Sequence, residues 1–207
     1  MSSNALVDFA RDAVDVCIRW GPGAYAGVRT ELLMDDVLFP VLSPELCTGR
    51  RLAAPADLAG LPLLRAEGED WTPWFRAAGL DWPEPASGLM MSDSGLVLQA
   101  AIEGRGVALA RRSLAALALR AGKLVRPYDI EIPAVFGPQN AARGANAAAV
   151  PVDRRPRWRY WVVLPERAAD TPLLQSFLEW LRAETAADLA APLEPASHVI
   201  DLPSRGG

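Results

Sequence analysis

The sequence is poor in the residues on which many enzymes depend. Its single histidine, His198, lies close to the C-terminus, and its two cysteines, Cys17 and Cys47, show no CxxC or other metal-ligand spacing. A Ser-His-Asp triad, a histidine-ligated zinc site and most imidazole chemistry are therefore disfavoured. The cysteines are expected to be reduced, buried thiols. We expect a protein that is not an enzyme, with no catalytic residues, no metal and no cofactor.

Long apolar runs and an excess of positive charge are also missing. No segment approaches the roughly 18 to 20 residues of a membrane helix, and residues 1–15 lack the features of a signal peptide. A cytoplasmic protein without a membrane partner is expected. With 21 basic and 25 acidic residues, no global positive field attracts nucleic acid. The basic cluster at residues 154–159 is interpreted as a solvated loop, with nucleic-acid contact as the less favoured alternative.

What is present is the composition of a globular protein, with 51% hydrophobic and 22% charged residues. Apolar segments alternate between strand and helix patterns through the middle of the chain. The expected strands are 61–65, 89–91, 107–110 and 124–128, and the expected helices are 70–78, 94–103 and 113–120. Asp70 is predicted to cap the first of these helices, with Trp71 and Trp74 on its buried side. This alternation predicts an α/β fold with a largely parallel sheet.

The two ends of the chain add further elements. We expect a short helix over residues 4–12, a buried parallel-type strand over 14–20, and strands at 28–34 and 37–42. Near the other end, the pattern predicts a strand at 158–164 and a helix over 172–187 whose apolar side faces inward. Residues 134–157 are interpreted as a mobile loop, and residues 188–207 as a disordered tail.

Several segments, taken in order, resemble one protein family. Residues 7–21 (VDFARDAVDVCIRWG) resemble a helix-strand segment of LysR-type transcriptional regulators. Residues 32–46 (LLMDDVLFPVLSPEL) are similar to the segment where that family's chain crosses between the lobes of its effector domain. Residues 92–109 (SDSGLVLQAAIEGRGVAL) resemble a helix, turn and strand of the second lobe. Residues 160–165 and the helix around 177–181 resemble the return strand and the last helix. The resemblance spans roughly residues 3 to 185.

The resemblance implies a two-lobe, periplasmic-binding-protein-like (type 2) effector domain of a bacterial regulator. Residues 1–40 and 158–187 would form the first lobe, and residues 41–133 the second. The domain would bind a small, anionic metabolite between the lobes and would belong to a homo-oligomer. The family's winged helix-turn-helix, through which DNA is contacted, is not found in this sequence, nor are the first strand and helix of the first lobe. The first lobe is therefore expected to be incomplete.

The candidate ligand-binding residues are Ser3, Arg19, Arg65, Ser92, Asp93 and Ser94. By the resemblance, Ser3 matches the position where the ligand meets the first lobe, although a frayed terminal residue is the favoured alternative. Arg19 ends a strand on the expected cleft side. Residues 92–94 join a strand to a helix, where ligands bind in such sheets, but simple helix capping is an equal alternative. Arg65 could line the cleft or form a solvated pair with Glu67.

Two further alternatives stay open. Trp71, Trp74 and Trp82 could form an aromatic ligand cage, but the spacing of the first two favours a place in the core. The chain could also be a truncated fragment that does not sense effector, or a stand-alone small-molecule-binding protein.

Overall fold

The chain folds as two compact α/β units in the computed structural model, which describes residues 7–9, 11–23, 25–135, 157–167 and 171–193. Unit 1 comprises Met1–Asp35 and Arg157–Pro192, and unit 2 comprises Asp36–Pro156 and Leu193–Gly207. The chain therefore leaves unit 1 after Asp35 and returns to it at Arg157.

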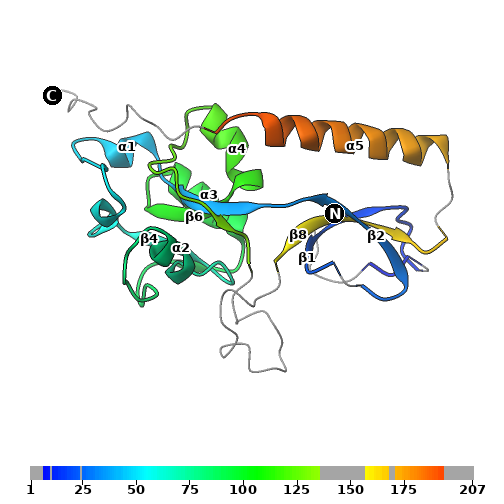
Figure 1. Ribbon diagram of the computed structural model, residues 1–207, viewed down its shortest axis with the longest axis horizontal. Coiled ribbons are helices and arrows are strands. Elements are labelled where there is room, and N and C mark those ends of the chain that lie inside the picture. The colour runs from blue at the N-terminus through cyan, green and yellow to red at the C-terminus, as the bar shows by residue number, and fades with distance from the viewer. Residues whose placement is uncertain (1–6, 10, 24, 136–156, 168–170, 194–207) are drawn as a thin grey trace. The chain divides into compact units, whose positions relative to one another are not determined.

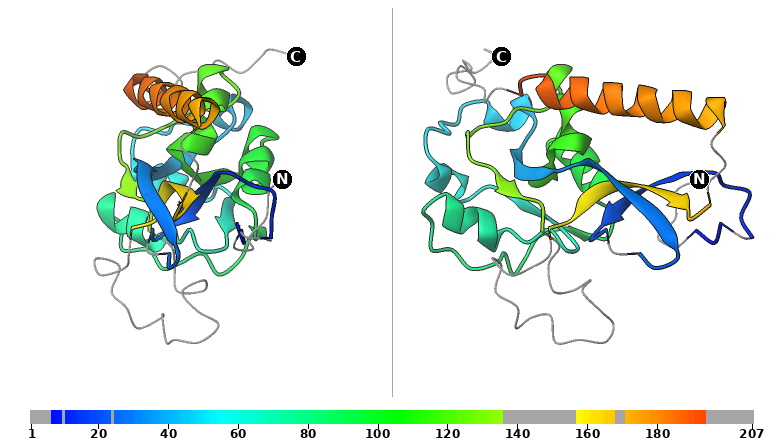
Figure 2. Two further views of the ribbon diagram at one scale, coloured as in Figure 1. Left: turned by 90° about the vertical axis from the view of Figure 1, so that its right-hand side faces the viewer. Right: turned by 45° about the vertical axis from the view of Figure 1, so that its right-hand side comes forward.

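Unit 1 is a three-stranded antiparallel sheet packed against one long helix. Its strands have the order β1-β8-β2, with β1 at Cys17–Gly21, β2 at Val28–Met34 and β8 at Arg159–Pro165, and its helix is α5 (Pro172–Ala190). Figures 1 and 2 show α5 running alongside this sheet. The predicted strands at 28–34 and 158–164 and the helix from residue 172 are confirmed.

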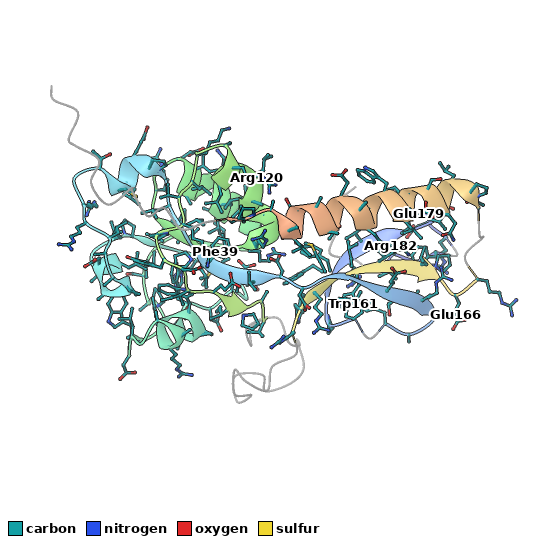
Figure 3. All side chains as sticks on the ribbon, turned by 45° about the horizontal axis from the view of Figure 1, so that its top comes forward. Phe39, Arg120, Trp161, Glu166, Glu179 and Arg182 are labelled. Atoms are coloured by element: carbon teal, nitrogen blue, oxygen red, sulfur yellow. The ribbon has the colours of Figure 1, made fainter. Side chains whose placement is uncertain are left out.

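Helix α5 covers one face of the sheet because its apolar residues recur at helical spacing. Leu174 and Leu178 pack with Val162 and Leu164 of β8, with Phe177 and Leu181 at the margin of the same cluster. Thr171 caps the helix by accepting a hydrogen bond from the Leu174 amide, and Pro172 occupies the first turn. At the solvent edge, Arg182 donates two 2.8 Å hydrogen bonds to the Glu31 carboxylate of β2 (Figure 3).

Two predictions for the start of unit 1 are wrong. The described residues between 7 and 12 form a single turn, in which the Asp8 carbonyl accepts from the amides of Arg11 and Asp12, and no helix. A helix this short is unstable unless packing supports it. The strand predicted as parallel is β1, which pairs antiparallel with β8. Its partner comes from a segment some 140 residues away, and that pairing leaves no signal in the pattern of β1 itself.

Unit 2 is a five-stranded mixed sheet with helices packed against it. The strand order is β5-β4-β6-β3-β7. The strands are β3 (Val37–Val41), β4 (Leu63–Ala66), β5 (Met90–Met91), β6 (Val107–Arg111) and β7 (Ile132–Pro133). The helices are α1 (Pro44–Cys47), the 3-10 helix η1 (Pro55–Leu58), α2 (Thr72–Ala77), α3 (Ser94–Ile102) and α4 (Arg112–Arg120). Strand β4 is parallel to both β5 and β6, whereas β3 is antiparallel to β6 and β7.

The core of unit 2 lies where the sheet meets α3 and α4, which Figure 1 draws in green. Ala100, Ala101, Ala115 and Ala116 are all buried, and these small side chains let both helices approach the sheet and each other closely. The ring of Phe39 on β3 (Figure 3) packs beneath the guanidinium of Arg126, whose carbon lies 4.4 Å from the ring centroid. Arg126 is itself only 5% exposed and bonds Tyr128, Asp129 and Leu193.

Two local predictions for unit 2 are also wrong. Residues 124–128 form no strand and contribute only an isolated bridge between Val125 and Leu42. Asp70 is not the cap of α2: the helix begins after Trp71, whose side chain makes no capping bond. The Glu84 carboxylate accepts from the amides of Trp71 and Thr72 and from the Thr72 hydroxyl instead. Glu84 lies in a loop that follows α2 in the sequence. The residues just before the helix therefore give no sign of this cap.

Candidate functional site

Three parallel strands of unit 2 end at the same edge of the sheet. Because β4 pairs in parallel with β5 on one side and β6 on the other, the residues that follow these strands are neighbours. Residues 92–94 follow β5, residues 67–69 follow β4, and Arg111 ends β6. We call this group the carboxyl edge. In open α/β sheets, ligands bind beyond such edges, so this is the candidate site within unit 2.

Glu69 lies at the centre of the carboxyl edge. Its side chain is 4% exposed, and its Oε1 accepts a 2.9 Å hydrogen bond from the Ser94 hydroxyl and lies 2.8 Å from Nε of Arg111. Burial raises the pKa of the Glu69 carboxyl, and the nearby Asp36 charge adds to that rise, while Arg111 and Ser94 oppose it. Ser94, a predicted site residue, is therefore held by a buried carboxylate.

A second buried carboxylate, Asp36, lies at the start of unit 2. It is 6% exposed and accepts hydrogen bonds from the Ser113 hydroxyl at 2.5 Å, the Ser113 amide at 3.3 Å and the Val37 amide at 2.9 Å. Burial raises the pKa of Asp36, against the lowering by these hydrogen bonds and by the charge of Arg111. Asp36, Glu69 and Arg111 thus form one electrostatically coupled group in the interior of unit 2.

Asp93 and Ser92 differ in what they do. The Asp93 carboxylate caps α3, because Oδ1 accepts from the amide of Gly95 at 2.7 Å and of Leu96 at 3.3 Å. These two amides are therefore already occupied. Ser92 is exposed, and within the described part of the chain its hydroxyl has no hydrogen-bond partner. Of the three predicted residues, Ser92 keeps its polar group available to a ligand.

Arg65 does not pair with Glu67. Its Nη1 donates to the carbonyl of Pro85 at 2.8 Å and its Nη2 to that of Gly88 at 3.3 Å. Carbonyl oxygens carry no formal charge, so the positive charge of Arg65 is not neutralised by these contacts. The side chain joins β4 to the loop that leads into β5.

Arg19 lies on β1 in unit 1, whereas the carboxyl edge belongs to unit 2. Its guanidinium carbon lies 4.8 Å from the centroid of the Tyr25 ring, and both residues line a cavity of about 130 Å³. Cys17 lines the same cavity and is a free, half-buried cysteine, whereas the free Cys47 is buried.

The remaining sequence predictions have mixed outcomes. Ser3 lies outside the described residues, as does His198. Trp71 and Trp74 are fully buried and contact each other and Phe75, which confirms their place in the core. The sequence analysis did not identify the three residues of the coupled group, which are Asp36, Glu69 and Arg111. The position of Glu69 just after a strand and of Arg111 at a strand end is the signal that could have drawn attention to them.

The fold defines the class of the protein. Two α/β units, with a chain that passes from the first to the second and back, are the organisation of two-lobe, periplasmic-binding-protein-like ligand-binding domains. The described helices include none with both the length and the apolarity needed to cross a membrane.

The family follows from comparison with known sequences. A family model described as "LysR substrate binding domain" matches residues 1–186, and the chain therefore belongs to this family. It is 35% identical over 183 residues to the "Glycine cleavage system transcriptional activator" of Escherichia coli K12, covering 87% of this chain and 53% of that protein. It is 31% identical over 180 residues to the "HTH-type transcriptional activator AmpR" of Enterobacter cloacae, covering 86% and 53%. The chain spans about half the length of these relatives.

Comparison with solved structures gives the same family and fold. The effector domain of AmpR from Pseudomonas aeruginosa superposes with a TM-score of 0.65 at 28% identity, covering 90% of this chain and 79% of that one. The AmpR effector-binding domain from Citrobacter freundii gives 0.66 at 25% identity, covering 89% and 81%. The predicted family and fold class are thus confirmed. The relatives are transcriptional regulators.

Proposed function

We propose that this domain senses a small anionic metabolite and that the carboxyl edge of unit 2 supplies part of its contact surface. The observation that carries the proposal is the convergence of residues 92–94, residues 67–69 and Arg111 where three parallel strands end. Binding between the two lobes is the mode that the family resemblance implies.

Two groups in unit 2 suit an anion: Ser92, which belongs to the carboxyl edge, and Arg65, one residue before the end of β4. Within the described part of the chain, the Arg65 guanidinium donates only to carbonyl oxygens and pairs with no carboxylate. The Ser92 side chain is exposed. Glu69 and Arg111 compensate each other's charge at 2.8 Å, so they would shape and support the site rather than attract an ion. Ser94 would be positioned by Glu69.

Calorimetry with amino acids and aromatic acids, each paired with its neutral amide, tests the proposal. We expect a micromolar dissociation constant for at least one anion and much weaker binding of its amide. Arg65→Gln should weaken binding by about tenfold to a hundredfold, since charge-assisted hydrogen bonds contribute roughly 1.5 to 3 kcal/mol. Arg76→Gln, at an exposed position on α2, is the control and should leave binding unchanged. A folded sample that binds no member of the panel would contradict the proposal.

Control of transcription belongs to the whole regulator. We infer that effector binding shifts the domain between two states, and a ligand can do this only to the extent that its affinity differs between them. Assembly into a homo-oligomer, and contact with DNA through a winged helix-turn-helix, are part of the same proposal. Sedimentation of the chain with and without effector would report a ligand-dependent change in assembly.

A further inference from the structure

We propose that Glu69 is a proton switch at the carboxyl edge of unit 2: the edge stays closed while Glu69 is protonated, and it opens to water as the carboxyl group ionises. The proposal rests on three features: a buried carboxyl group with few hydrogen-bond donors, a second acid nearby, and contacts of Glu69 with three elements of unit 2. No ligand is required, so the switch holds or fails separately from the function proposed above.

The carboxyl group of Glu69 has few donors for an ionised group. The side chain is 4% exposed. Its Oε1 accepts a hydrogen bond from the Ser94 hydroxyl and lies 2.8 Å from Nε of Arg111, whereas the buried Oε2 has no hydrogen-bond partner among the described residues. An ionised carboxylate has about four acceptor sites, and leaving some of them empty in the interior is unfavourable. A proton on the group removes that cost.

Asp36 provides a comparison within the same unit. Its carboxylate accepts three hydrogen bonds, from the amides of Val37 and Ser113 and from the Ser113 hydroxyl. Three donors stabilise an ionised carboxylate better than the one hydroxyl that serves Glu69. When the two acids compete for one proton, Glu69 therefore keeps it.

The surrounding charges also favour a proton on Glu69. The charged groups that act on it are Arg111 of β6 and Asp36, which precedes β3. They are close because β3 pairs with β6, with Leu38 opposite Arg111. Burial raises the pKa of Glu69 and the charge of Asp36 adds to the rise, while Arg111 and the uncharged Ser94 of α3 oppose it. One guanidinium thus serves two acids.

Ionisation of Glu69 acts on three elements at once. The Glu69 amide donates to the carbonyl of Ala66 at the end of β4, and the side chain contacts the first residue of α3 and the last residue of β6. An ionised Oε2 requires a donor, and water is the donor that can reach it when these elements separate. The carboxyl edge therefore loosens as the proton leaves.

The direction of the pH effect follows from this difference between the closed and the open edge. Because the pKa of Glu69 is higher in the closed edge, the stability of the closed state is fully present below the ordinary pKa of a glutamate, about 4.3. That stability is lost as the pH rises through the pKa of the closed state. Between these two values, each pH unit should increase opening by up to about tenfold.

Carbon-13 NMR of the 207-residue chain measures the titration of Glu69 directly. We expect its carboxyl carbon to titrate at a higher pH than an ordinary glutamate. Asp36→Asn should lower the midpoint, because a like charge is removed, and Ser94→Ala should raise it, because a donor is removed. Ser92→Ala, at an exposed position, is the control and should leave it unchanged. A midpoint in the ordinary range, or one that neither Asp36→Asn nor Ser94→Ala moves, would overturn the proposal.

Hydrogen exchange tests the link between the proton and opening. The amides of Glu67, Glu69 and Val97 are hydrogen-bonded at the carboxyl edge. Their protection, corrected for the intrinsic exchange rate, should fall by up to about tenfold per pH unit in the wild type and much less in Glu69→Gln. The amide of Leu124, bonded to the carbonyl of Ala118, is the internal control and should change less than the edge amides. A fall of the same size in both proteins would show that Glu69 does not control opening.

Discussion

The hydroxyl of Ser94, the first residue of α3, donates a 2.9 Å hydrogen bond to the buried carboxylate of Glu69, which lies 25 positions earlier in the chain. The same carboxylate oxygen lies 2.8 Å from Nε of Arg111 at the end of β6. One buried acid thus connects residues at the carboxyl ends of β5, β4 and β6. The contacts of Glu69 with Ser94 and Arg111 therefore determine whether the carboxyl edge has a defined shape.

Ser94→Ala removes a hydrogen-bond donor to the buried carboxyl group of Glu69. We expect a loss of about 1 to 3 kcal/mol in the free energy of unfolding, because the Glu69 carboxylate then loses one of its partners. Urea denaturation followed by circular dichroism measures this. Ser92→Ala is the matched control, since Ser92 is exposed, and its effect should stay within about 0.5 kcal/mol. Equal effects of the two substitutions would show that the Ser94 bond is not formed in solution.

Asp93→Ala removes the cap of α3. Two amides, of Gly95 and Leu96, lose their acceptor, and we expect destabilisation by about 1 kcal/mol. Asp93→Ser retains a capping oxygen and should restore most of the stability in the same denaturation experiment. If serine is no better than alanine, Asp93 contributes through its charge rather than through the cap.

The buried carboxyl of Asp36 makes stability depend on pH. Because its pKa is higher in the folded chain than in the unfolded one, the folded state binds the proton more readily. Its contribution is therefore fully present below the unfolded pKa and is lost as the pH rises through the folded pKa. Relative to Asp36→Asn, which does not titrate, the wild type should become less stable as the pH rises from about 4 towards 7. Denaturation midpoints of both proteins across this range measure the effect, and a relative stability that increases with pH would contradict it.

Helix α5 carries a matched pair of leucines that tests its packing. Leu178 is 2% exposed and packs on the sheet of unit 1, whereas Leu173 on the same helix is 82% exposed. Leu178→Ala should cost about 2 to 5 kcal/mol, and Leu173→Ala less than about 0.5 kcal/mol. Hydrogen exchange of the β8 amides reports the loss within unit 1, and similar protection in the two variants would mean that α5 does not pack there.

Elements whose pattern is complete within a few residues were predictable from sequence. The apolar residues of α5 recur at helical spacing, and the apolar side that the sequence predicts to face inward is the side that packs on β8. Strand β2 and helix α3 begin where the sequence predicts them, at Val28 and Ser94, because turn and capping residues act locally. The spacing of Trp71 and Trp74 along one helix is also a local signal, and the core position that it predicts is confirmed by their burial.

Features that depend on a distant partner were not predictable. The antiparallel pairing of β1 with β8, the cap that Glu84 supplies to α2 and the coupling of Asp36 with Ser113 join residues far apart in sequence. The short turn around Asp8 shows the converse, since the described residues between 7 and 12 form no helix although their pattern predicts one. The sequence by itself determined the family, the class of fold and most element positions, because these follow from local periodicity and recognisable segments. Only the tertiary structure decided which charges are buried together, because desolvation and ion pairing act between side chains that the fold, and not the chain order, makes neighbours.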